Sequence, residues 1–535
     1  MSIFKKILVD VPDDKGVHTK VAGAKNEKYV YKHVQYFRDT NGKPRNKSKS
    51  IGKLDTISGR MYPNDNYYEL YHIDISLPDI SIWEYGYTYL VLKVCHDIGL
   101  MECLSHAFGT QTMEIIIMAA YILREGSVMD AIDDWQQKNY FLDYDRLLTS
   151  KTCSRAFASL AVAKRYMFFD LWVANAYNGG CVCYDVTSVS SYAKEIVGVE
   201  RGYNRDGDDL CQFNLGMFCD EDDKTPLYYS RYNGSITDKT NLPYVLASAK
   251  ALGIERVKMV VDGGFWSEEC IKNLNKHFDA FTIGMPASLK ESERMLTSYS
   301  QGIETYENEL VYRHVYCISV NTEIYGVTGR VLIFFDAWSH LCLCDDMHDR
   351  IDALQSELAA LKRYPKSKLS RYTPYFMIAK HTYDTGFNYA IDVAKVEQLR
   401  KTKGFFLLFS NDMTSSPSDI LYYYRAKDAD EKIFEQIKYN MGGYRIHTHN
   451  EETTDGKTFV IFIACIIRSY MLSKLSKFLT DDSTSLKKIF NQLSNITIVA
   501  NNQGRRFTKA LTKKQKQILS AFGADHDILS SLTGE

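Results

Sequence analysis

The hydrophobic and polar positions of the chain change their period several times, and each change marks a predicted region. Residues 29–38 alternate with the period of a strand, and residues 39–42 supply a hairpin turn before a basic return strand. From about residue 80 to residue 176 the apolar positions follow helical spacing. The pattern therefore predicts a β-ribbon in residues 1–75 and a helical domain in residues 76–178, and the basic residues of the ribbon make it a candidate for DNA binding.

Short apolar runs of the strand type begin at Gly180. Three such runs, at 181–186, 213–219 and 227–230, are followed by a helical stretch at 241–252 and a fourth run at 257–261. The order strand, strand, strand, helix, strand opens a ribonuclease H-like sheet. We therefore expect an α/β fold whose core is a ribonuclease H-like mixed five-stranded sheet flanked by helices.

The predicted core is interrupted before its fifth strand, at residues 405–409. Its two parts are then residues 179–285 and 404–470, separated by an insertion at 286–403 that is mostly β with a helical arm. The arm contains an amphipathic helix at 345–362, with Ile351, Leu354, Leu358 and Leu361 on one side.

Helices are also predicted in the last quarter of the chain, at 419–439, 459–473 and 512–522. The last of these belongs to a basic, helical C-terminal region, residues 471–535. The longest apolar stretches, 115–123 and 459–467, are shorter than the roughly 20 residues that span a bilayer. No membrane partner is therefore expected.

Composition adds a charge asymmetry that the net charge of -1 conceals. Residues 1–60 carry 14 Lys and Arg against 6 Asp and Glu, and residues 468–535 carry 11 against 5. Such one-sided excess favours contact with a polyanion, although a solvated surface also explains it. The residues predicted to bind DNA in these regions are Arg38, Lys43, Arg45, Lys47, Lys49, Arg505 and Arg506.

The twelve cysteines are spread along a long chain without regular spacing, which favours reduced thiols and a cytoplasmic protein. The pairs Cys181-x-Cys183 and Cys342-x-Cys344 lack zinc-knuckle spacing, and each lies in an apolar run that indicates a strand. The acidic residues 220–223 fall between two predicted strands, where a solvated hairpin turn is favoured over a metal site.

Two aspartates stand on predicted strands where chemistry is common. Asp185 lies within the apolar run CVCYDVTSVS, and Asp262 ends the run VKMVVDGGFWS. Gly263 and Gly264 let the backbone turn away close to a ligand after Asp262. A helix cap or a turn former is the alternative for either residue alone.

A third acidic residue belongs to a spaced set in LYYYRAKDADEKIFEQIKYN. Tyr424, Lys427, Glu431 and Lys438 stand at offsets of 0, 3, 7 and 14, which on one helix fall within about 60° of each other. An aromatic ring, a carboxylate and two cations then share a face. A surface helix with a Lys427–Glu431 salt bridge is the simpler alternative.

This set resembles the Y-x2-R-x3-E-x6-K signature of DDE transposases of bacterial insertion sequences, with Lys427 in place of the usual Arg. The resemblance covers about residues 180–465, through DVTS, GYNRDGDDLCQFNLGMF, the N-G of RYNGSITDKT, and VVDGGFWS. It implies a catalytic triad of Asp185, Asp262 and Glu431, separated by 77 and 169 residues. The long second gap accommodates the predicted insertion.

The resemblance further implies two divalent metal ions, Mg²⁺ or Mn²⁺, with Asp185 holding both and Asp262 and Glu431 one each. Cleavage at transposon ends would be followed by strand transfer, in which the freed 3′-hydroxyl attacks target DNA. The implied partners are terminal inverted repeats, target DNA and a second copy of the chain, in a synaptic complex within a bacterial, nucleoid-associated setting. Tyr424, Lys427 and Lys438 would contact phosphates there, and the helical domain, residues 76–178, would serve in DNA binding or dimerisation.

Arg445, His447 and His449 follow the predicted helix, and Arg445 joins the expected DNA surface. For the two histidines, a structural or DNA-contact role is favoured over metal binding. Two other functions remain open on the sequence: a catalytically inactive or domesticated DNA-binding regulator, and another ribonuclease H-like nuclease.

Overall fold

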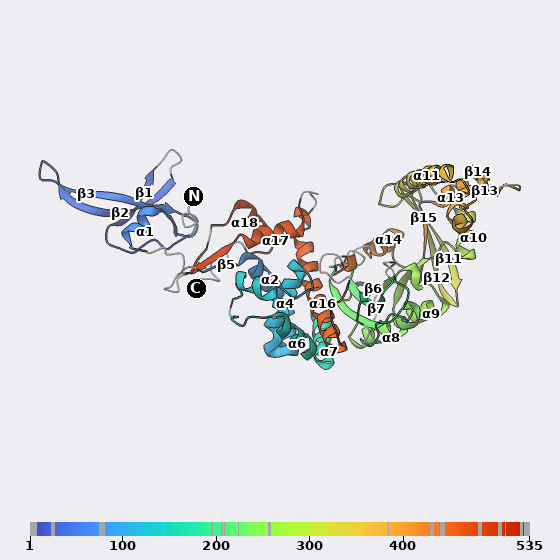
Figure 1. Cartoon of the computed structure of the whole chain (residues 1–535), viewed down its shortest axis with the longest axis horizontal. Coiled ribbons are helices and arrows are strands. Elements are labelled where there is room, and N and C mark those ends of the chain that lie inside the picture. Colours follow the sequence, from blue (N-terminus) through green and yellow to red (C-terminus); the bar gives the residue numbers. More distant parts are fainter. Residues whose placement is uncertain are drawn as a thin grey trace. The chain divides into compact units, whose positions relative to one another are not determined.

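The computed structural model divides into two compact units, coloured by sequence in Figure 1. Unit 1 comprises Met1–Ala176, Val189–Val199 and Ile433–Glu535, and unit 2 comprises Tyr177–Ser188 and Glu200–Lys432. The structure describes residues 8–22, 27–73, 81–142, 144–193, 196–204, 207, 209–222, 224–254, 258–382, 385–427, 433–435, 437–438, 445–479, 484–500, 506–508, 510–524 and 528.

The N-terminal residues form a four-stranded antiparallel sheet in the order β1-β2-β3-β4. Its centre is the long hairpin of β2 (Glu27–Arg38) and β3 (Pro44–Leu54), so the predicted β-ribbon hairpin is confirmed. β1 (Val17–Ala22) and β4 (Met61–Pro63) flank it, and α1 (Asp65–Leu70) packs on β3. Val30, Ile51 and Met61 bury the base of the hairpin, whereas its distal half is exposed.

Helices predominate between residues 86 and 176, as the apolar spacing predicts. They are α2 (Gly86–Asp97), α3 (Leu100–Phe108), α4 (Thr112–Glu125), α5 (Ile132–Lys138), α6 (Ser150–Ser159) and α7 (Val162–Ala176). The residue that caps α6 is Thr149, whose hydroxyl accepts from the Thr152 N–H.

A late helix, α16 (Glu451–Lys474), completes the core of unit 1 by packing against α4 and α6. Gly456 makes the α6 contact possible, because a Cβ there would lie 2.0 Å from the Phe157 carbonyl oxygen. The apolar stretch 459–467 is predicted to be too short to cross a bilayer. It is part of the 24-residue helix α16, which by length and composition alone could cross one. Its apolar window is 78% buried, which is typical of a core helix.

The C-terminal region is only partly helical. α17 (Leu486–Ser494) and α18 (Lys513–Ser520) are present, but β16 (Thr497–Ala500) and β17 (Arg506–Thr508) lie between them. β16 pairs with β5 (Ser81–Glu84), which forms a three-stranded sheet. Sequence periodicity missed these strands because each is only three or four residues long, and because β5, one partner of β16, precedes it by more than 400 residues.

The core of unit 2 is one mixed sheet of eight strands, in the order β11-β12-β15-β10-β9-β6-β7-β8. β6, β9 and β10 run parallel, and the remaining pairs described here are antiparallel. The strands are β6 (Cys181–Ser191), β7 (Cys211–Asp220), β8 (Pro226–Asn233), β9 (Lys258–Val261), β10 (Ala280–Met285), β11 (Val315–Ile324), β12 (Val327–Asp336) and β15 (Phe405–Ser410).

The predicted mixed α/β sheet is therefore present, with eight strands in place of the expected five. β10 follows β9 through α9 (Glu268–His277), and α8 (Asp238–Ala251) precedes β9. The two remaining strands come from the predicted insertion: the β11–β12 hairpin joins the sheet through β15, where Phe334 stacks on Phe406 with ring centroids 4.9 Å apart.

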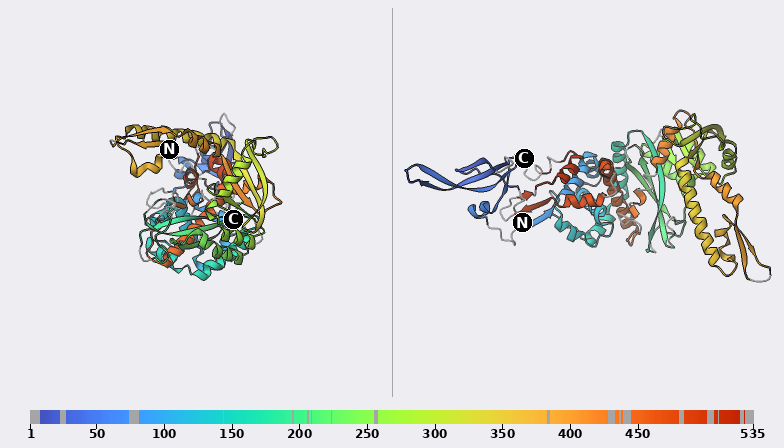
Figure 2. Two further views of the ribbon diagram at one scale, coloured as in Figure 1. Left: turned by 90° about the vertical axis from the view of Figure 1, so that its right-hand side faces the viewer. Right: turned by 90° about the horizontal axis from the view of Figure 1, so that it is seen from above.

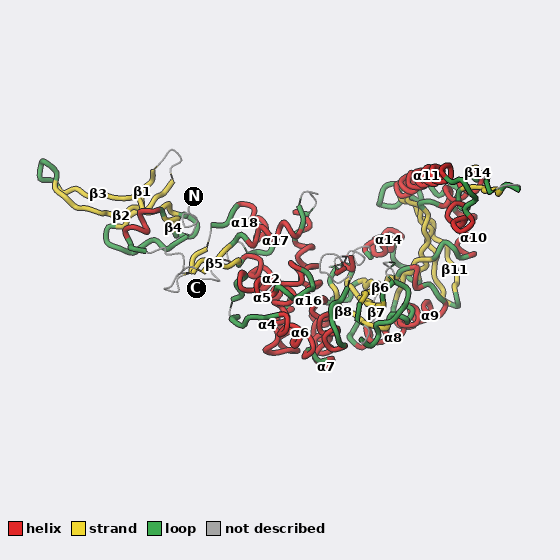
Figure 3. Tube along the Cα trace, viewed as in Figure 1, coloured by secondary structure: helices red, strands yellow, loops and turns green. Residues whose placement is uncertain are grey.

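The rest of the insertion forms a helical arm, which we define as residues 337–403. α11 (Ala337–Ala360) packs against α12 (Leu369–Tyr372), the hairpin of β13 (Phe376–Lys380) and β14 (Phe387–Ile391), and α13 (Val393–Thr402). Figures 2 and 3 show the long α11 with this hairpin beside it. α10 (Lys290–Tyr299) precedes the β11–β12 hairpin.

Three predictions for the arm are wrong in detail. α11 starts eight residues before residue 345, because the Asp336 carboxylate caps it by accepting from the Ser339 N–H at 3.0 Å. Cys342 and Cys344 are consequently helical rather than in a strand. Leu361 follows the helix as its C-cap and is 37% exposed, so it lies outside the apolar stripe.

The helix predicted at 419–439 is α14 (Pro417–Ala426) over its described first part. Ser416 and Asp419 form a capping box, and Pro417 occupies the first turn, where its missing N–H costs nothing. Lys427 is the C-cap of this helix. Residues 428–432, which include Glu431, lie outside the described part of the chain.

Candidate active site

Asp185 and Asp262 lie side by side because of the register between two parallel strands. β6 pairs with β9 from Cys181 opposite Lys258 to Tyr184 opposite Val261, so the next residue of each strand is an aspartate. Neighbouring strands are about 4.8 Å apart, which brings the two carboxylates to one end of the sheet. Two residues separated by 77 positions in sequence thus form one acidic site.

Asp262 is held by a tight turn at the end of β9. It caps the 3-10 turn Gly263–Phe265, and its carboxylate accepts from the Gly264 N–H at 3.4 Å. The turn passes close to β10, because a Cβ on Gly284 would lie 2.8 Å from the Gly263 nitrogen. The two glycines therefore allow a packing distance that larger residues exclude.

Lys427 brings a positive charge to this acidic site. Its ammonium lies 3.1 Å from Asp262 Oδ1, and its side chain is only 6% exposed. Burial alone would lower the pKa of Lys427, but the negative charges of Asp262 and Asp185 outweigh it and raise that pKa. Burial would likewise raise the pKa of Asp262, and Lys427 instead lowers it. Both groups are therefore charged at neutral pH.

Tyr424 stands one helical turn before Lys427, on α14. The Lys427 ammonium lies 5.9 Å from the centre of the Tyr424 ring, and a Cβ on Gly284 would approach the Tyr424 hydroxyl to 2.6 Å. The ring therefore packs over the glycine of β10 beside the acidic site. Ile420 and Leu421 anchor the same helix in the core, together with Leu332 and Leu408.

The acidic turn after β7 contacts the elements that carry Asp185 and Lys427, and the sequence analysis did not predict this role. Residues 220–223 were predicted to be a solvated turn, but Asp220 and Glu221 are buried, with Glu221 fully inaccessible. Burial raises the pKa of Glu221, while the adjacent Lys224, 2.5 Å away, opposes this. Lys224 also donates to the Ala426 carbonyl at 3.5 Å, directly before Lys427.

Lys224 adopts a left-handed backbone conformation, with φ of 56°, which is uncommon for a residue with a side chain. The Glu221 N–H donates to the Cys181 carbonyl at 2.9 Å and ties the turn to β6. The turn therefore links the strand that carries Asp185 to the end of the helix that carries Lys427. The sequence contains a signal for this role, since Lys224 directly follows the four acidic residues 220–223.

The described carboxylates fit a divalent cation. Carboxylate oxygens are the ligands that Mg²⁺ prefers, and the Asp262 carboxylate already holds one positive charge, that of Lys427. Within the described residues no group of three or more His, Cys, Asp or Glu is positioned to hold a metal ion. Asp185 and Asp262 are two such residues, and the predicted third, Glu431, lies outside the described part of the chain.

The predicted DNA-binding residues of the ribbon are at the surface. Arg45 pairs with Asp39 at 3.0 Å, and Lys49 pairs with Glu69 at 3.7 Å. Such exposed pairs contribute little and exchange readily for other anions. The exposed set comprises Arg38, Lys43, Arg45, Lys47 and Lys49.

The remaining predicted contacts lie in unit 1. Lys438 is buried, and Arg445 donates to the Tyr192 hydroxyl and stacks over that ring at 5.0 Å. Arg505 lies outside the described residues, and Arg506 is placed by its backbone on β17. These residues belong to unit 1, whereas Asp185, Asp262, Tyr424 and Lys427 belong to unit 2.

A second group of cations gathers before and within α16. His447 has a lowered pKa because it is partly buried and because Lys457 and Arg445 are positively charged neighbours. Lys457 is 3% exposed, and burial lowers its pKa to about 8. Sequence reasoning did not single out Lys457, since it reads as an ordinary surface lysine beside Asp455.

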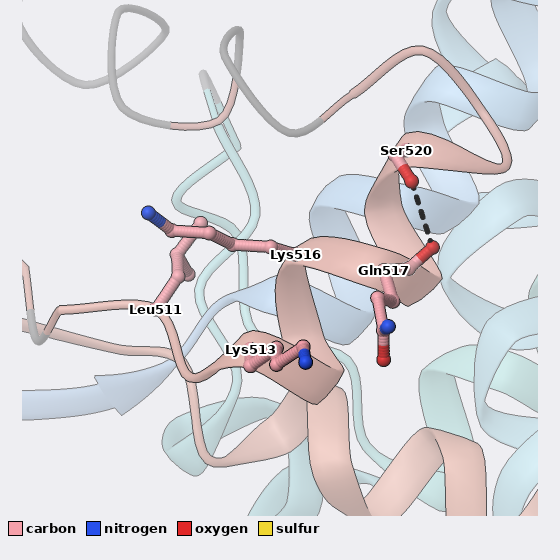
Figure 4. Close-up of a pocket in the computed structure, with 5 residues that line it drawn as sticks. All are labelled: Leu511, Lys513, Lys516, Gln517 and Ser520. Carbon is pink, nitrogen blue, oxygen red and sulfur yellow. Dashed lines mark hydrogen bonds between the residues drawn. The ribbon is translucent and has the colours of Figure 1, made fainter. Parts of the chain in front are cut away.

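A pocket of about 370 Å³ opens beside α18, in the basic C-terminal region (Figure 4). Lys513, Lys516 and Gln517 line it together with Leu511 and Ser520, and the Ser520 hydroxyl donates to the Gln517 carbonyl at 3.0 Å. These residues include no carboxylate, thiol or imidazole. The pocket therefore offers positive charge for binding but no group for acid–base or metal chemistry.

Comparison with known proteins places most of unit 2 in a family. Residues 179–467, more than half of the chain, match the family described as the transposase DDE domain. A solved structure titled as the piggyBac transposase synaptic complex with hairpin DNA is similar at a TM-score of 0.32 and 12% identity, covering 76% of this chain and 70% of that chain. No curated protein matches the chain.

Proposed function

Because this chain belongs to the transposase DDE domain family, we propose that it is a DNA transposase that cuts DNA at the ends of a mobile element and joins them to a target. The observation that carries the proposal is the matched register of Asp185 and Asp262 on two parallel strands. Within the family, we assign the chain to the bacterial insertion-sequence group with the Y-R-E-K signature.

The proposed catalytic groups are Asp185, Asp262 and Glu431, the last on the basis of the signature alone. They would hold two Mg²⁺ or Mn²⁺ ions, which polarise the phosphate and activate the attacking and leaving oxygens when bound. The chain supplies fixed carboxylates for this purpose, because β6 and the turn after β9 fix the position of each backbone.

Lys427 has two proposed roles at this site. It neutralises the paired aspartates, as its 3.1 Å contact with Asp262 supports, and it attracts a phosphate to their immediate surroundings. A lysine keeps the charge of the usual arginine but makes no bidentate contact, so phosphate orientation falls to other groups. Tyr424, packed beside Lys427, would contact the same phosphate.

The proposed partners are the terminal inverted repeats of the element and the target DNA, with two copies of the chain pairing two ends. The exposed cations of the β2–β3 ribbon would bind phosphates along the repeat. Lys438, Arg445, Arg505 and Arg506 remain proposed DNA contacts. The proposed setting is the bacterial cytoplasm, on the nucleoid.

The test is metal-dependent cleavage of a duplex that carries the element ends. Asp185→Asn and Asp262→Asn should each lower the rate of strand cleavage at least about a thousandfold, because a misplaced metal loses several kcal/mol of charge stabilisation. Glu431→Gln tests the third residue in the same assay. Ser188→Ala, on the same strand, is the matched control and should cleave normally.

Strand cleavage by Asp185→Asn at the wild-type rate would contradict the proposed active site. Duplex binding without cleavage in the parent protein, at any concentration of Mg²⁺ or Mn²⁺, would instead indicate a DNA-binding regulator. Cleavage without joining to target DNA would indicate another nuclease.

A further inference from the structure

The helical arm, residues 337–403, carries its negative and positive charges on different segments. α11 contains five Asp and Glu against one Arg, whereas residues 362–403 contain ten Lys and Arg against three Asp and Glu. The net charge of the arm hides this division, and neither the ribbon nor the acidic site includes these residues.

The acidic side of the arm is defined by the geometry of α11. Its buried residues, Cys344, Met347, Ile351, Leu354 and Leu358, follow a spacing of three and four. At about 100° per residue these side chains centre roughly 170° away from Asp345, Asp346, Asp349 and Asp352. These four acids therefore point away from the apolar core of the arm, and all four are exposed.

The basic residues follow α11, in a segment whose apolar residues pack on the same core. Tyr372 and Phe376 join Leu354 and Leu358 there, which fixes the loop after α11, α12 and β13 against the helix. Four exposed cations occur within seven residues of this segment: Lys362, Arg363, Lys366 and Lys368. We call them the basic cluster.

The basic cluster differs from several nearby cations of the arm in its ion pairing. Nearby cations of the arm are paired, Arg371 with Glu357 at 3.0 Å, Lys395 with Asp392 at 3.2 Å and Arg400 with Glu397 at 3.3 Å. Over the described part of the chain, no ion pair engages any member of the cluster. Four unpaired charges this close together repel one another and favour binding of an extended anion.

We propose that the arm binds the sugar-phosphate backbone of double-stranded DNA through the basic cluster, with the acidic face of α11 turned away from the duplex. The inference rests on the proposed function for the presence of DNA and adds a second contact surface outside the acidic site. Exposed lysines and arginines bind phosphates without reading bases, so the contact is independent of sequence. The acidic face sets the orientation, because a duplex approaching α11 from that side is repelled.

The experiment compares full-length protein with two variants in EDTA, so that binding is measured without cleavage. One variant neutralises the basic cluster (K362Q/R363Q/K366Q/K368Q), and the matched control neutralises the acidic face (D345N/D346N/D349N/D352N). Fluorescence anisotropy of a random-sequence duplex gives the affinity at several salt concentrations. All eight side chains are exposed, so unfolding temperatures should be unchanged in both variants.

We expect neutralisation of the basic cluster to flatten the plot of log affinity against log salt by about 0.9 per lost phosphate contact, up to about 3 to 4 in slope. The control should keep the parental slope and bind equally or more tightly. Equal slopes for the basic-cluster variant and the parent would overturn the inference. So would loss of affinity in the acidic-face control, which would show that α11 itself takes part in the contact.

The two levels of the proposal fail differently. If the parent protein binds and cleaves element ends but the basic-cluster variant keeps its salt slope, only the arm assignment is wrong. If the parent protein does not bind DNA at all, the proposed function fails, and the arm assignment fails with it.

Discussion

Replacing Lys427 with Gln tests whether this ammonium offsets the charge of the paired aspartates. The change leaves a neutral side chain of similar length beside Asp262, so two carboxylates lie together with no cation between them. We expect unit 2 to lose stability in EDTA. We also expect divalent cations to restore it, because Mg²⁺ and the lysine ammonium neutralise the same oxygens.

The size of the effect follows from burial. Removing one partner of a buried ion pair costs about 3–5 kcal/mol. Lys427 is 6% exposed but Asp262 is 45% exposed, so water reaches the carboxylate that is left behind. We therefore expect a loss of about 1–2 kcal/mol, which corresponds to ~2–8 °C in the unfolding temperature of a unit of this size.

The assay is thermal unfolding in EDTA and in 10 mM Mg²⁺, with calorimetric titration of Mg²⁺ as a second measurement. The variant should bind Mg²⁺ about tenfold more tightly than the parent, a gain of ~1.4 kcal/mol. Lys258→Gln is the matched control, since Lys258 pairs with Asp412 at 3.0 Å at the other end of β9. That control should be destabilised by the same order without becoming sensitive to Mg²⁺.

A Mg²⁺-induced rise in unfolding temperature no larger in Lys427→Gln than in the parent protein would refute the reasoning. The lysine would then contribute to packing alone, and the metal would bind elsewhere.

Two further changes test the geometry around the site. Gly284→Ala should cost about 1–3 kcal/mol in the free energy of unfolding, because its Cβ would lie 2.6 Å from the Tyr424 hydroxyl. Gly264→Ala is the control and should cost little, since the nearest atom to its Cβ would be 3.6 Å away. Equal costs for the two variants in urea titrations would contradict this packing. Burial alone would raise the pKa of Asp412, but hydrogen bonds, chiefly from Ser415, hold it far below its usual range. Asp412→Asn should therefore cost about 1–3 kcal/mol at pH 7, and the difference should shrink as the pH falls from about 4 to about 2, because the ionised form is lost only as the pH approaches the strongly lowered folded-state pKa. A difference as large at pH 2 as at pH 7 would argue against an ionised Asp412 as the source.

Local pattern was enough to predict the elements that carry the site. The strands that bear Asp185 and Asp262 are short apolar runs, and their period identifies them without tertiary information. Their register is a different matter, because pairing across 77 residues depends on how β6 and β9 meet. The family signature predicted that Asp185 and Asp262 belong to one site, and the β6–β9 register explains physically why they lie together.

The contacts of individual charges were harder to predict. Lys427 was expected to pair with Glu431 or with phosphate, yet within the described residues its partner is Asp262. The acidic turn at Glu221 was expected in solvent, because four acids in a row usually are. Its burial depends on the end of α14 some 200 residues later, which no local window contains.

The path of the chain through unit 1 has a consequence for its biosynthesis. α4 and α6 emerge from the ribosome early, but α16, which covers their apolar faces, is translated about 290 residues after α6. At ~5–20 residues per second the nascent chain leaves those faces exposed for about 15–60 s. Most of unit 2 is made in that interval, so ribosome stalling or truncation before residue 451 would release an aggregation-prone protein even when its acidic site is complete.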